Sequence, residues 1–320
     1  MDSTASRTLA VVGVACLLVI PYHRTISAAG LREEAIRHRE EGVERIKVGD
    51  LAGAMTAFQK AAIIDPSYAV PHNDLGLLFE QQGDFNTAKR SYERAILIDP
   101  NYLVAYLNLA TLHERFGNKD QALFHWVKAG MLYEQQGDLD SAKAAFQKVL
   151  DADPNNLEAL MSSAMLQGRQ GNRELAVFQW VKAGLLYEQQ GDMNAATRSY
   201  ERALVVDPEY VEALSNLALL YDRRGNQELA IFYWLKLGLR YEQRNELDAA
   251  RRAYERALAL NPNNIDTLAN LAMHYERVGD QGQATSYWQK CRDLGLPNDP
   301  WTVRAEERLV VLGALKSGQV

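Results

Sequence analysis

Residues 103–156 read LVAYLNLATLHERFGNKDQALFHWVKAGMLYEQQGDLDSAKAAFQKVLDADPNN. The pattern returns every 54 residues along the rest of the chain, most visibly at its glycine, tryptophan and proline positions. These positions are Gly117, Gly171, Gly225 and Gly279; Trp126, Trp180, Trp234 and Trp288; and Pro100, Pro154, Pro208 and Pro262. A fixed period of this length is typical of architectures in which each unit packs on its neighbours. The sequence therefore divides into units 103–156, 157–210 and 211–264, followed by a partial unit, 265–294.

Each 54-residue unit is predicted to contain three helices. In the quoted unit, residues 103–116 form the first helix and residues 137–150 form the last, which ends before Asp153-Pro154. Proline stops a helix because it lacks an N–H group and disfavours helical geometry at the residue before it. Residues 118–136 contain no turn signal, and their apolar side chains surround most of a helix circumference. We expect one continuous helix of about 18 residues there, packed on two sides.

A shorter period precedes these units. Thirty-four residues separate two similar sets, which are Gly49, Ala54, Phe58, Ala61 and Pro66 in residues 35–68, and Gly83, Ala88, Tyr92, Ala95 and Pro100 in residues 69–102. This resembles the tetratricopeptide repeat family, whose unit is a 34-residue helix–turn–helix. The second unit also has the family's Leu75-Gly76 pair and an aromatic residue, Phe79, whereas the first has Glu41-Gly42 and Arg45 in that region.

The resemblance implies an all-α fold, a right-handed helical-repeat solenoid over residues 30–294. We expect about sixteen helices in the whole chain and no strands. Small residues at the recurring positions allow two helices to approach closely, and glycine at the turns accepts backbone angles that other residues resist.

The resemblance also points to candidate binding residues. In this family the first helices of the repeats line a concave groove, and their sixth and thirteenth residues point into it. The candidate groove residues are Asn108, Asn216 and Asn270 at the sixth position, where the remaining unit has Ser162, and Arg115, Arg169, Arg223 and Arg277 at the thirteenth. Asparagine would hydrogen-bond the backbone of an extended peptide, and arginine would pair with acidic side chains or a terminal carboxylate.

A structural interpretation stands beside this functional one. The arginines directly precede the turns, where a cation offsets the helix dipole, and all of these residues would recur if the unit was simply duplicated. Four lysines also recur with the 54-residue period and are predicted to be solvated surface; they are Lys128, Lys182, Lys236 and Lys290. The clustered Lys-Asn-Asn-Lys-Arg arrangement of chaperone-tail binders is not found, so chaperone binding is not predicted.

The N-terminal segment contains twelve consecutive apolar residues, Leu9–Ile20. As a helix they would be about 18 Å long, which is short of the roughly 30 Å hydrocarbon core of a membrane. The run fits the central region of a signal peptide, and Ser27-Ala28-Ala29 offers a cleavage site before Gly30. Residues 1–29 are therefore predicted to be a cleaved signal peptide or an uncleaved short membrane anchor, and the reading that they are neither stays open.

The C-terminal residues 295–320 depart from the repeat. Gly295-Leu296-Pro297 breaks the preceding helix, Asp299 is a good helix N-cap, and proline suits the first helical position that follows. We expect an amphipathic helix over 300–316 that covers the last apolar surface of the array. A partner-binding helix is the alternative.

No motif indicates an enzyme. The six histidines, which are His23, His38, His72, His113, His125 and His274, have no metal-site spacing, and there is no phosphate loop or nucleophile elbow. We expect no catalytic residues, no metal and no cofactor. The net charge of -6 without a long basic run disfavours nucleic-acid binding.

Together these features predict a non-catalytic scaffold that presents a groove to protein or peptide partners. The N-terminal segment indicates a place at the cell envelope, membrane-anchored or exported to the periplasm of a bacterium, rather than in the cytoplasm. A self-associating structural repeat protein is the alternative, because open-ended stacking of repeats gives dimers or filaments.

Overall fold

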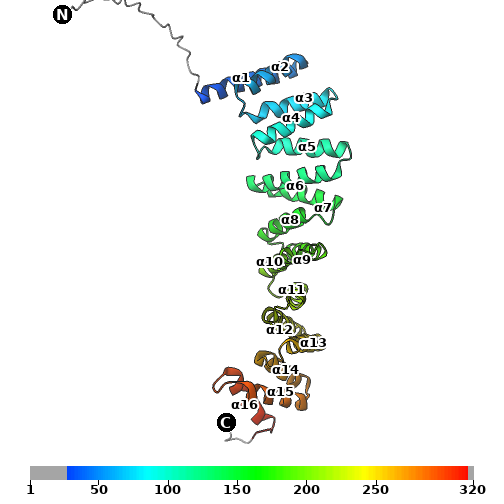
Figure 1. Ribbon diagram of the computed structural model, residues 1–320. Coiled ribbons are helices and arrows are strands. Elements are labelled where there is room, and N and C mark those ends of the chain that lie inside the picture. The colour runs from blue at the N-terminus through cyan, green and yellow to red at the C-terminus, as the bar shows by residue number, and fades with distance from the viewer. Residues whose placement is uncertain (1–26, 316–320) are drawn as a thin grey trace, which may run out of the picture. The chain divides into compact units, whose positions relative to one another are not determined.

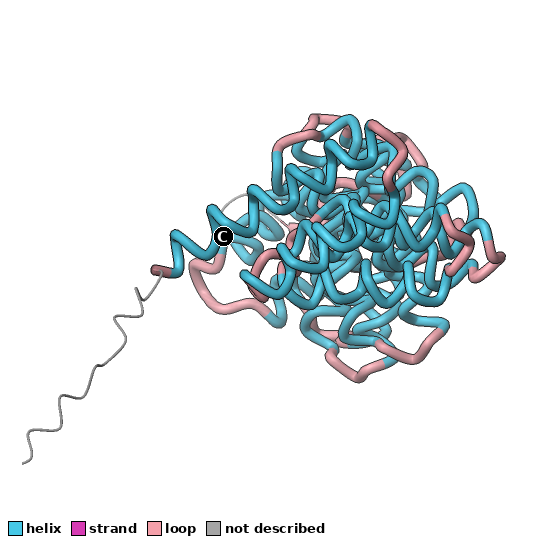
Figure 2. Tube along the Cα trace, turned by 90° about the horizontal axis from the view of Figure 1, so that it is seen from above, coloured by secondary structure: helices cyan, strands magenta, loops and turns pink. Residues whose placement is uncertain are grey.

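The computed structural model describes residues 27–315, in which helices follow one another through short turns (Figure 1). This part of the chain holds sixteen helices and no strand, which confirms the all-α prediction; Figure 2 shows the same helices in cyan and their loops in pink. The helices are α1 (Ala28–Lys47), α2 (Leu51–Ile64), α3 (Ala69–Gln81), α4 (Phe85–Ile98), α5 (Leu103–Arg115), α6 (Lys119–Gln136), α7 (Leu139–Ala152), α8 (Leu157–Arg169), α9 (Arg173–Gln189), α10 (Met193–Val206), α11 (Val211–Arg223), α12 (Gln227–Gln243), α13 (Leu247–Leu260), α14 (Ile265–Val278), α15 (Gln281–Leu294) and α16 (Pro300–Val311). They belong to two compact units, unit 1 ending at Ala105 and unit 2 beginning at Tyr106.

Several of the turns between helices have a left-handed residue, in some of them followed by an aspartate that caps the next helix. After α9, Gly191 has a φ of 80°, and at the corresponding position after α12 Asn245 has a φ of 59°. Glycine has no Cβ to resist this conformation, and asparagine tolerates it better than most residues. Asp192 then accepts a hydrogen bond from the Ala195 backbone N–H at 2.9 Å, and Asp138 caps α7 in the same way. These bonds satisfy backbone donors that the first helical turn leaves without partners.

Unit 1 contains two helix pairs, α1 with α2 and α3 with α4. In each pair a glycine of the first helix lies against a fully buried aromatic ring of the second: Gly42 against Phe58 and Gly76 against Tyr92. A side chain at either glycine would collide with the ring, so the small residue sets the distance between the helices.

In unit 2 the three long helices are unbroken, with 18 residues in α6 and 17 each in α9 and α12. The continuous helix expected within residues 118–136 is confirmed as α6. Trp126 of α6 donates its Nε1–H to Glu114 of α5 at 2.8 Å, and Gly130, one turn later, lies against the ring of Phe146 in α7. One helix thus completes the pair with α5 and opens the pair with α7, which explains its apolar circumference.

The last helix, α16, packs against α14 and α15. Asp299 caps it by accepting hydrogen bonds from the backbone N–H groups of Trp301 and Thr302, at 3.0 and 3.3 Å. Ala305 and Leu309 are fully buried on the face toward α14 and α15. The helix begins at Pro300, as the sequence indicates, and ends at Val311 within the expected range 300–316.

The predicted N-terminal signal peptide or anchor falls largely outside the described residues, since α1 begins at Ala28. Between residues 27 and 315, no helix is both long enough and apolar enough to cross a membrane.

Asp222 stands where two other units have a glutamate that binds the repeated tryptophan. Trp126 and Trp288 each donate to a glutamate twelve residues earlier, at 2.8 and 2.5 Å, whereas Trp234 has an aspartate there and its buried Nε1 has no hydrogen-bond partner. We expect Asp222→Glu to supply this acceptor and to raise the free energy of unfolding by about 1 kcal/mol. Urea denaturation measures the gain.

The control for Asp222→Glu is the same change in a Trp234→Phe background, where the donor is gone and no gain is expected. Loss of the ion pair from Arg256 to residue 222 is not expected, because Glu114 of the corresponding unit holds Trp126 and a lysine at once. An equal gain in both backgrounds would contradict the explanation.

Candidate protein-binding face

The four arginines predicted to line the groove lie at the ends of α5, α8, α11 and α14, and all four are exposed. Three of them form ion pairs with glutamates of the long helices, which are Arg169 with Glu134 at 2.6 Å, Arg223 with Glu188 at 2.5 Å, and Arg277 with Glu242 at 2.6 Å. Each pair links the end of one helix to the end of the long helix before it. Exposed ion pairs stabilise a folded protein by about 1 kcal/mol or less, so these ion pairs hold the arginine side chains only weakly.

The three asparagines predicted to line the groove differ in how accessible they are. Asn270 is buried and donates its Nδ2–H to the backbone oxygen of Asp266 at 2.7 Å. Asn108 and Asn216 are partly exposed, and Ser162 at the equivalent place is buried. These positions therefore do not make up a uniform row of accessible amides, and their role in binding stays a prediction.

The three long helices carry an exposed apolar stripe that the sequence analysis did not single out. Its aromatic members are Phe124, Phe178 and Phe232, which are 47%, 55% and 46% exposed. On α9 the phenylalanine is accompanied by exposed Leu175 and Leu185, and on α12 by exposed Leu229 and Leu239. Residues spaced by three and seven lie on the same face of a helix, so each set forms one stripe. We call these seven residues together the apolar face.

Phe124 of α6 and the stripe of α9 each lie beside a lysine that reaches the start of α8. Lys128, four residues after Phe124, is paired with Glu158 at the start of α8 at 2.7 Å. Lys182, four residues after the next phenylalanine, donates to the backbone oxygen of Pro154, just before α8, at 2.5 Å. Both lysines thus reach the same end of α8. Exposed apolar residues gathered in this way mark interaction surfaces more often than single ones do.

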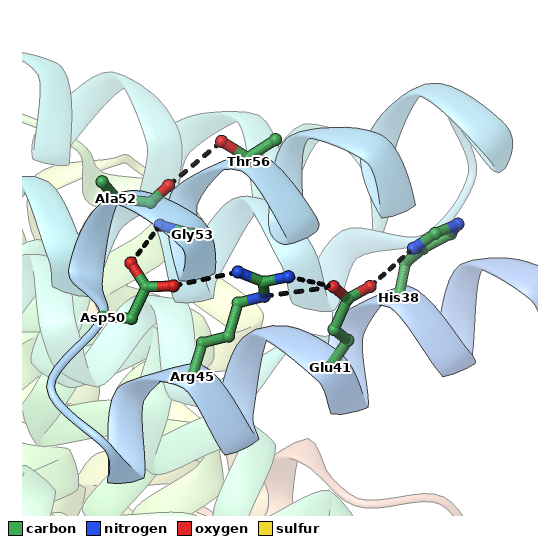
Figure 3. Close-up of polar contacts among 7 residues, drawn as sticks. All are labelled: His38, Glu41, Arg45, Asp50, Ala52, Gly53 and Thr56. Atoms are coloured by element: carbon green, nitrogen blue, oxygen red, sulfur yellow. Dashed lines mark hydrogen bonds and ion pairs between the residues drawn. The ribbon is translucent and has the colours of Figure 1, made fainter.

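Unit 1 contains a polar cluster at the α1–α2 turn, and Figure 3 shows that its members bind one another. Arg45 near the end of α1 donates to Glu41 at 2.7 Å and to Asp50 at 2.9 Å, and His38 lies 3.2 Å from the other oxygen of Glu41. Asp50 in turn caps α2 by accepting from the Gly53 backbone N–H at 2.8 Å. This bond, followed by the one from Arg45, lowers the pKa of Asp50. The cluster secures the α1–α2 turn.

Two histidines lie in the first helices of their units, on α5 and α14. Both His113 and His274 are buried, and Nδ1 of His274 lies 2.5 Å from Glu242, the partner of Arg277. Among residues 27–315, no group of three histidine, cysteine or acidic side chains is arranged to hold a metal ion.

A repeated helical array with a recurring exposed face defines the class of helical-repeat scaffolds, and the family comparison is specific. A family model described as "TPR repeat" matches residues 184–225 and 238–279, and two described as "Tetratricopeptide repeat" match residues 126–156 and 79–124. The chain belongs to the tetratricopeptide repeat family and is a protein–protein interaction scaffold. Members of this family are typically non-catalytic.

The similar proteins each match part of the chain. The "Protein CTR9 homolog" of Arabidopsis thaliana is 28% identical over 169 residues, which cover 48% of this chain and 14% of the relative. The "Photosystem I assembly protein Ycf3" of Prochlorococcus marinus (strain NATL2A) is 25% identical over 123 residues, 38% of this chain and 60% of the relative. This chain thus spans less than two thirds of either relative. Among solved structures, the TPR domain of P58(IPK) is 16% identical, with a TM-score of 0.29 and coverage of 89% of this chain and 99% of that one.

Proposed function

We propose that the apolar face of unit 2 is where this scaffold holds segments of its protein partners. The observation that carries the proposal is the repetition itself: α6, α9 and α12 each expose a phenylalanine at the same place. A folded chain gains nothing from leaving three such rings half in water, whereas a partner that covers them removes apolar area from water at about 25 cal/mol per Å².

The exposed candidate groove arginines fit this proposal as additional polar contacts for a partner. Their exposed ion pairs with Glu134, Glu188 and Glu242 can exchange for pairs with a partner, since such pairs are weak. The apolar residues would supply most of the binding energy and the polar residues would orient the partner, as is usual at protein interfaces.

We further propose that the scaffold works at the cell envelope, exported or held at a membrane. The support is the apolar run Leu9–Ile20 followed by the small residues Ser27-Ala28-Ala29. The bacterial origin is part of the same proposal.

The test is a crosslinked pull-down from the native organism with membrane and soluble fractions kept apart. Wild type is compared with a triple variant in which Phe124, Phe178 and Phe232 are changed to serine. These rings are half exposed, so the variant is expected to fold, which circular dichroism checks. Changing the arginines instead would also break their links to the long helices and would confuse the result.

We expect partners that are recovered with wild type, from the membrane-containing fraction, to fall at least tenfold with the folded triple variant. Undiminished recovery would contradict binding at the apolar face. Recovery of the chain alone would favour the self-association alternative, and recovery only from the soluble cytoplasmic fraction would contradict the envelope location.

A further inference from the structure

One lysine of the repeated series differs from its counterparts. The series, four residues after each phenylalanine, consists of Lys128, Lys182 and Lys236. The first is paired with a glutamate and the second with a backbone carbonyl, as described above. Lys236 has neither kind of partner within residues 27–315, and its Nζ lies 4.6 Å from the centre of the Phe232 ring.

Lys236 borders a hollow of about 250 Å³ between α12 and the turn that joins α10 to α11. Leu214 of α11, which is almost fully buried, forms its base, and Leu239 of the apolar face forms one wall. This volume is below the roughly 300–1,000 Å³ of sites for drug-sized ligands. The hollow therefore suits a single apolar side chain better than a cofactor.

The rim of the hollow carries more positive than negative charge. Arg240 on the rim is paired with Glu209 at 2.7 Å and donates to Gln243 at 2.9 Å, while its buried Nε has no hydrogen-bond partner. Lys236 adds a second cation without a carboxylate. Nζ of Lys236 can therefore donate a charge-assisted hydrogen bond to the carboxylate of a bound partner.

We infer that this hollow anchors a linear protein segment in which a bulky apolar side chain stands next to an aspartate or glutamate. The apolar side chain lies against Leu214 and Leu239, and the neighbouring carboxylate pairs with Nζ of Lys236. The inference rests on the proposed function, because it names the chemistry of the partner at one place on the apolar face.

The corresponding place in the preceding unit provides a matched comparison. There Nζ of Lys182 donates to the Pro154 carbonyl oxygen at 2.5 Å. A charge reversal at this lysine changes the net charge of the chain by the same amount as a reversal at Lys236, so general electrostatic effects are equal in the two variants.

The test uses the full-length chain to select binders from a displayed library of random twelve-residue peptides. We expect the selected peptides to share an apolar residue adjacent to an acidic one. Fluorescence anisotropy of a synthetic consensus peptide should show at least tenfold weaker binding to Lys236→Glu, with Lys182→Glu within twofold of wild type. Thermal unfolding of both variants checks that they remain folded.

The inference is overturned if no peptide is selected, if the consensus lacks an acidic residue, or if the two lysine variants bind alike. These results are separable from failure of the proposed function. Partners in the pull-down could be lost from the triple phenylalanine variant and retained by Lys236→Glu. That result would support the apolar face as the binding site and would contradict pairing of a partner carboxylate with Lys236.

Discussion

Replacing Trp288 with alanine is expected to lower the free energy of unfolding of the C-terminal helices by about 3–5 kcal/mol. The side chain is fully buried among Leu268, Leu309 and Cys291, and its Nε1–H donates to Glu276 at 2.5 Å. Its removal leaves a cavity in the place where α14, α15 and α16 meet. The substitution also removes one hydrogen bond from the Glu276 carboxylate. Burial raises the pKa of Glu276, but the hydrogen bonds from Arg308 and Trp288 outweigh it and hold this pKa below its ordinary value.

The Cys291 thiol provides a local measurement, which matters because repeat arrays can unfold in parts. Burial raises its pKa to about 12, so it reacts slowly with alkylating reagents in the folded protein. With Cys16 changed to serine, we expect alkylation in Trp288→Ala to be at least 100-fold faster, since each 1.4 kcal/mol is worth about tenfold. Trp288→Phe, which keeps most of the volume, should lose only about 1–2 kcal/mol. Equal alkylation rates in wild type and Trp288→Ala would refute this account.

Gly130→Ala is expected to destabilise unit 2 by about 2 kcal/mol, although alanine is the better helix former. The added Cβ would lie 2.6 Å from Cε1 and 2.9 Å from Cδ1 of Phe146, a ring that is fully buried and has no room to retreat. Urea denaturation followed by circular dichroism measures the loss.

Gly168→Ala is the matched control, since this glycine also lies in a helix of unit 2. Its new Cβ would meet only Ala176 at 3.8 Å and Val206 at 3.9 Å, which are ordinary contacts. Here the helix propensity should dominate and give a gain of about 0.5–1 kcal/mol. If both changes act in the same direction, close packing does not explain the glycine at position 130. A Phe146→Leu change should also recover part of the loss in Gly130→Ala.

Much of the fold is predictable because its determinants are local. The turn glycines, the acidic caps and the Asp-Pro stops act within a few residues, so helix positions follow from the printed sequence. The missing turn signal between residues 118 and 136 correctly indicated one helix. The 54-residue period is visible in the sequence and in the long helix α6. The matching family models describe tetratricopeptide repeats and do not include this longer period.

The candidate site was less predictable because it depends on contacts between helices. The glutamate partners of three groove arginines lie 35 residues earlier, on a helix two positions back, and no local pattern pairs them. The apolar face did leave a signal, namely the 54-residue spacing of Phe124, Phe178 and Phe232. The family resemblance assigns groove positions to the first helix of each unit and gives none for the long helices. The 54-residue period makes the lysines equivalent, and only the structure separates Lys236 from Lys128 and Lys182.

The shared long helices also limit how this array can change in length. In an ordinary chain of two-helix repeats, one repeat can be gained or lost and the neighbours still meet. Here a 34-residue excision from unit 2 would either cut through α6, α9 or α12 or remove two helices that pack on them, such as α7 and α8. Either way a long helix loses a partner, because each of them serves two pairs at once. The smallest segment that can be duplicated or deleted without an orphaned helix is the full set of three. Growth and loss in this part of the protein should therefore proceed in steps of three helices.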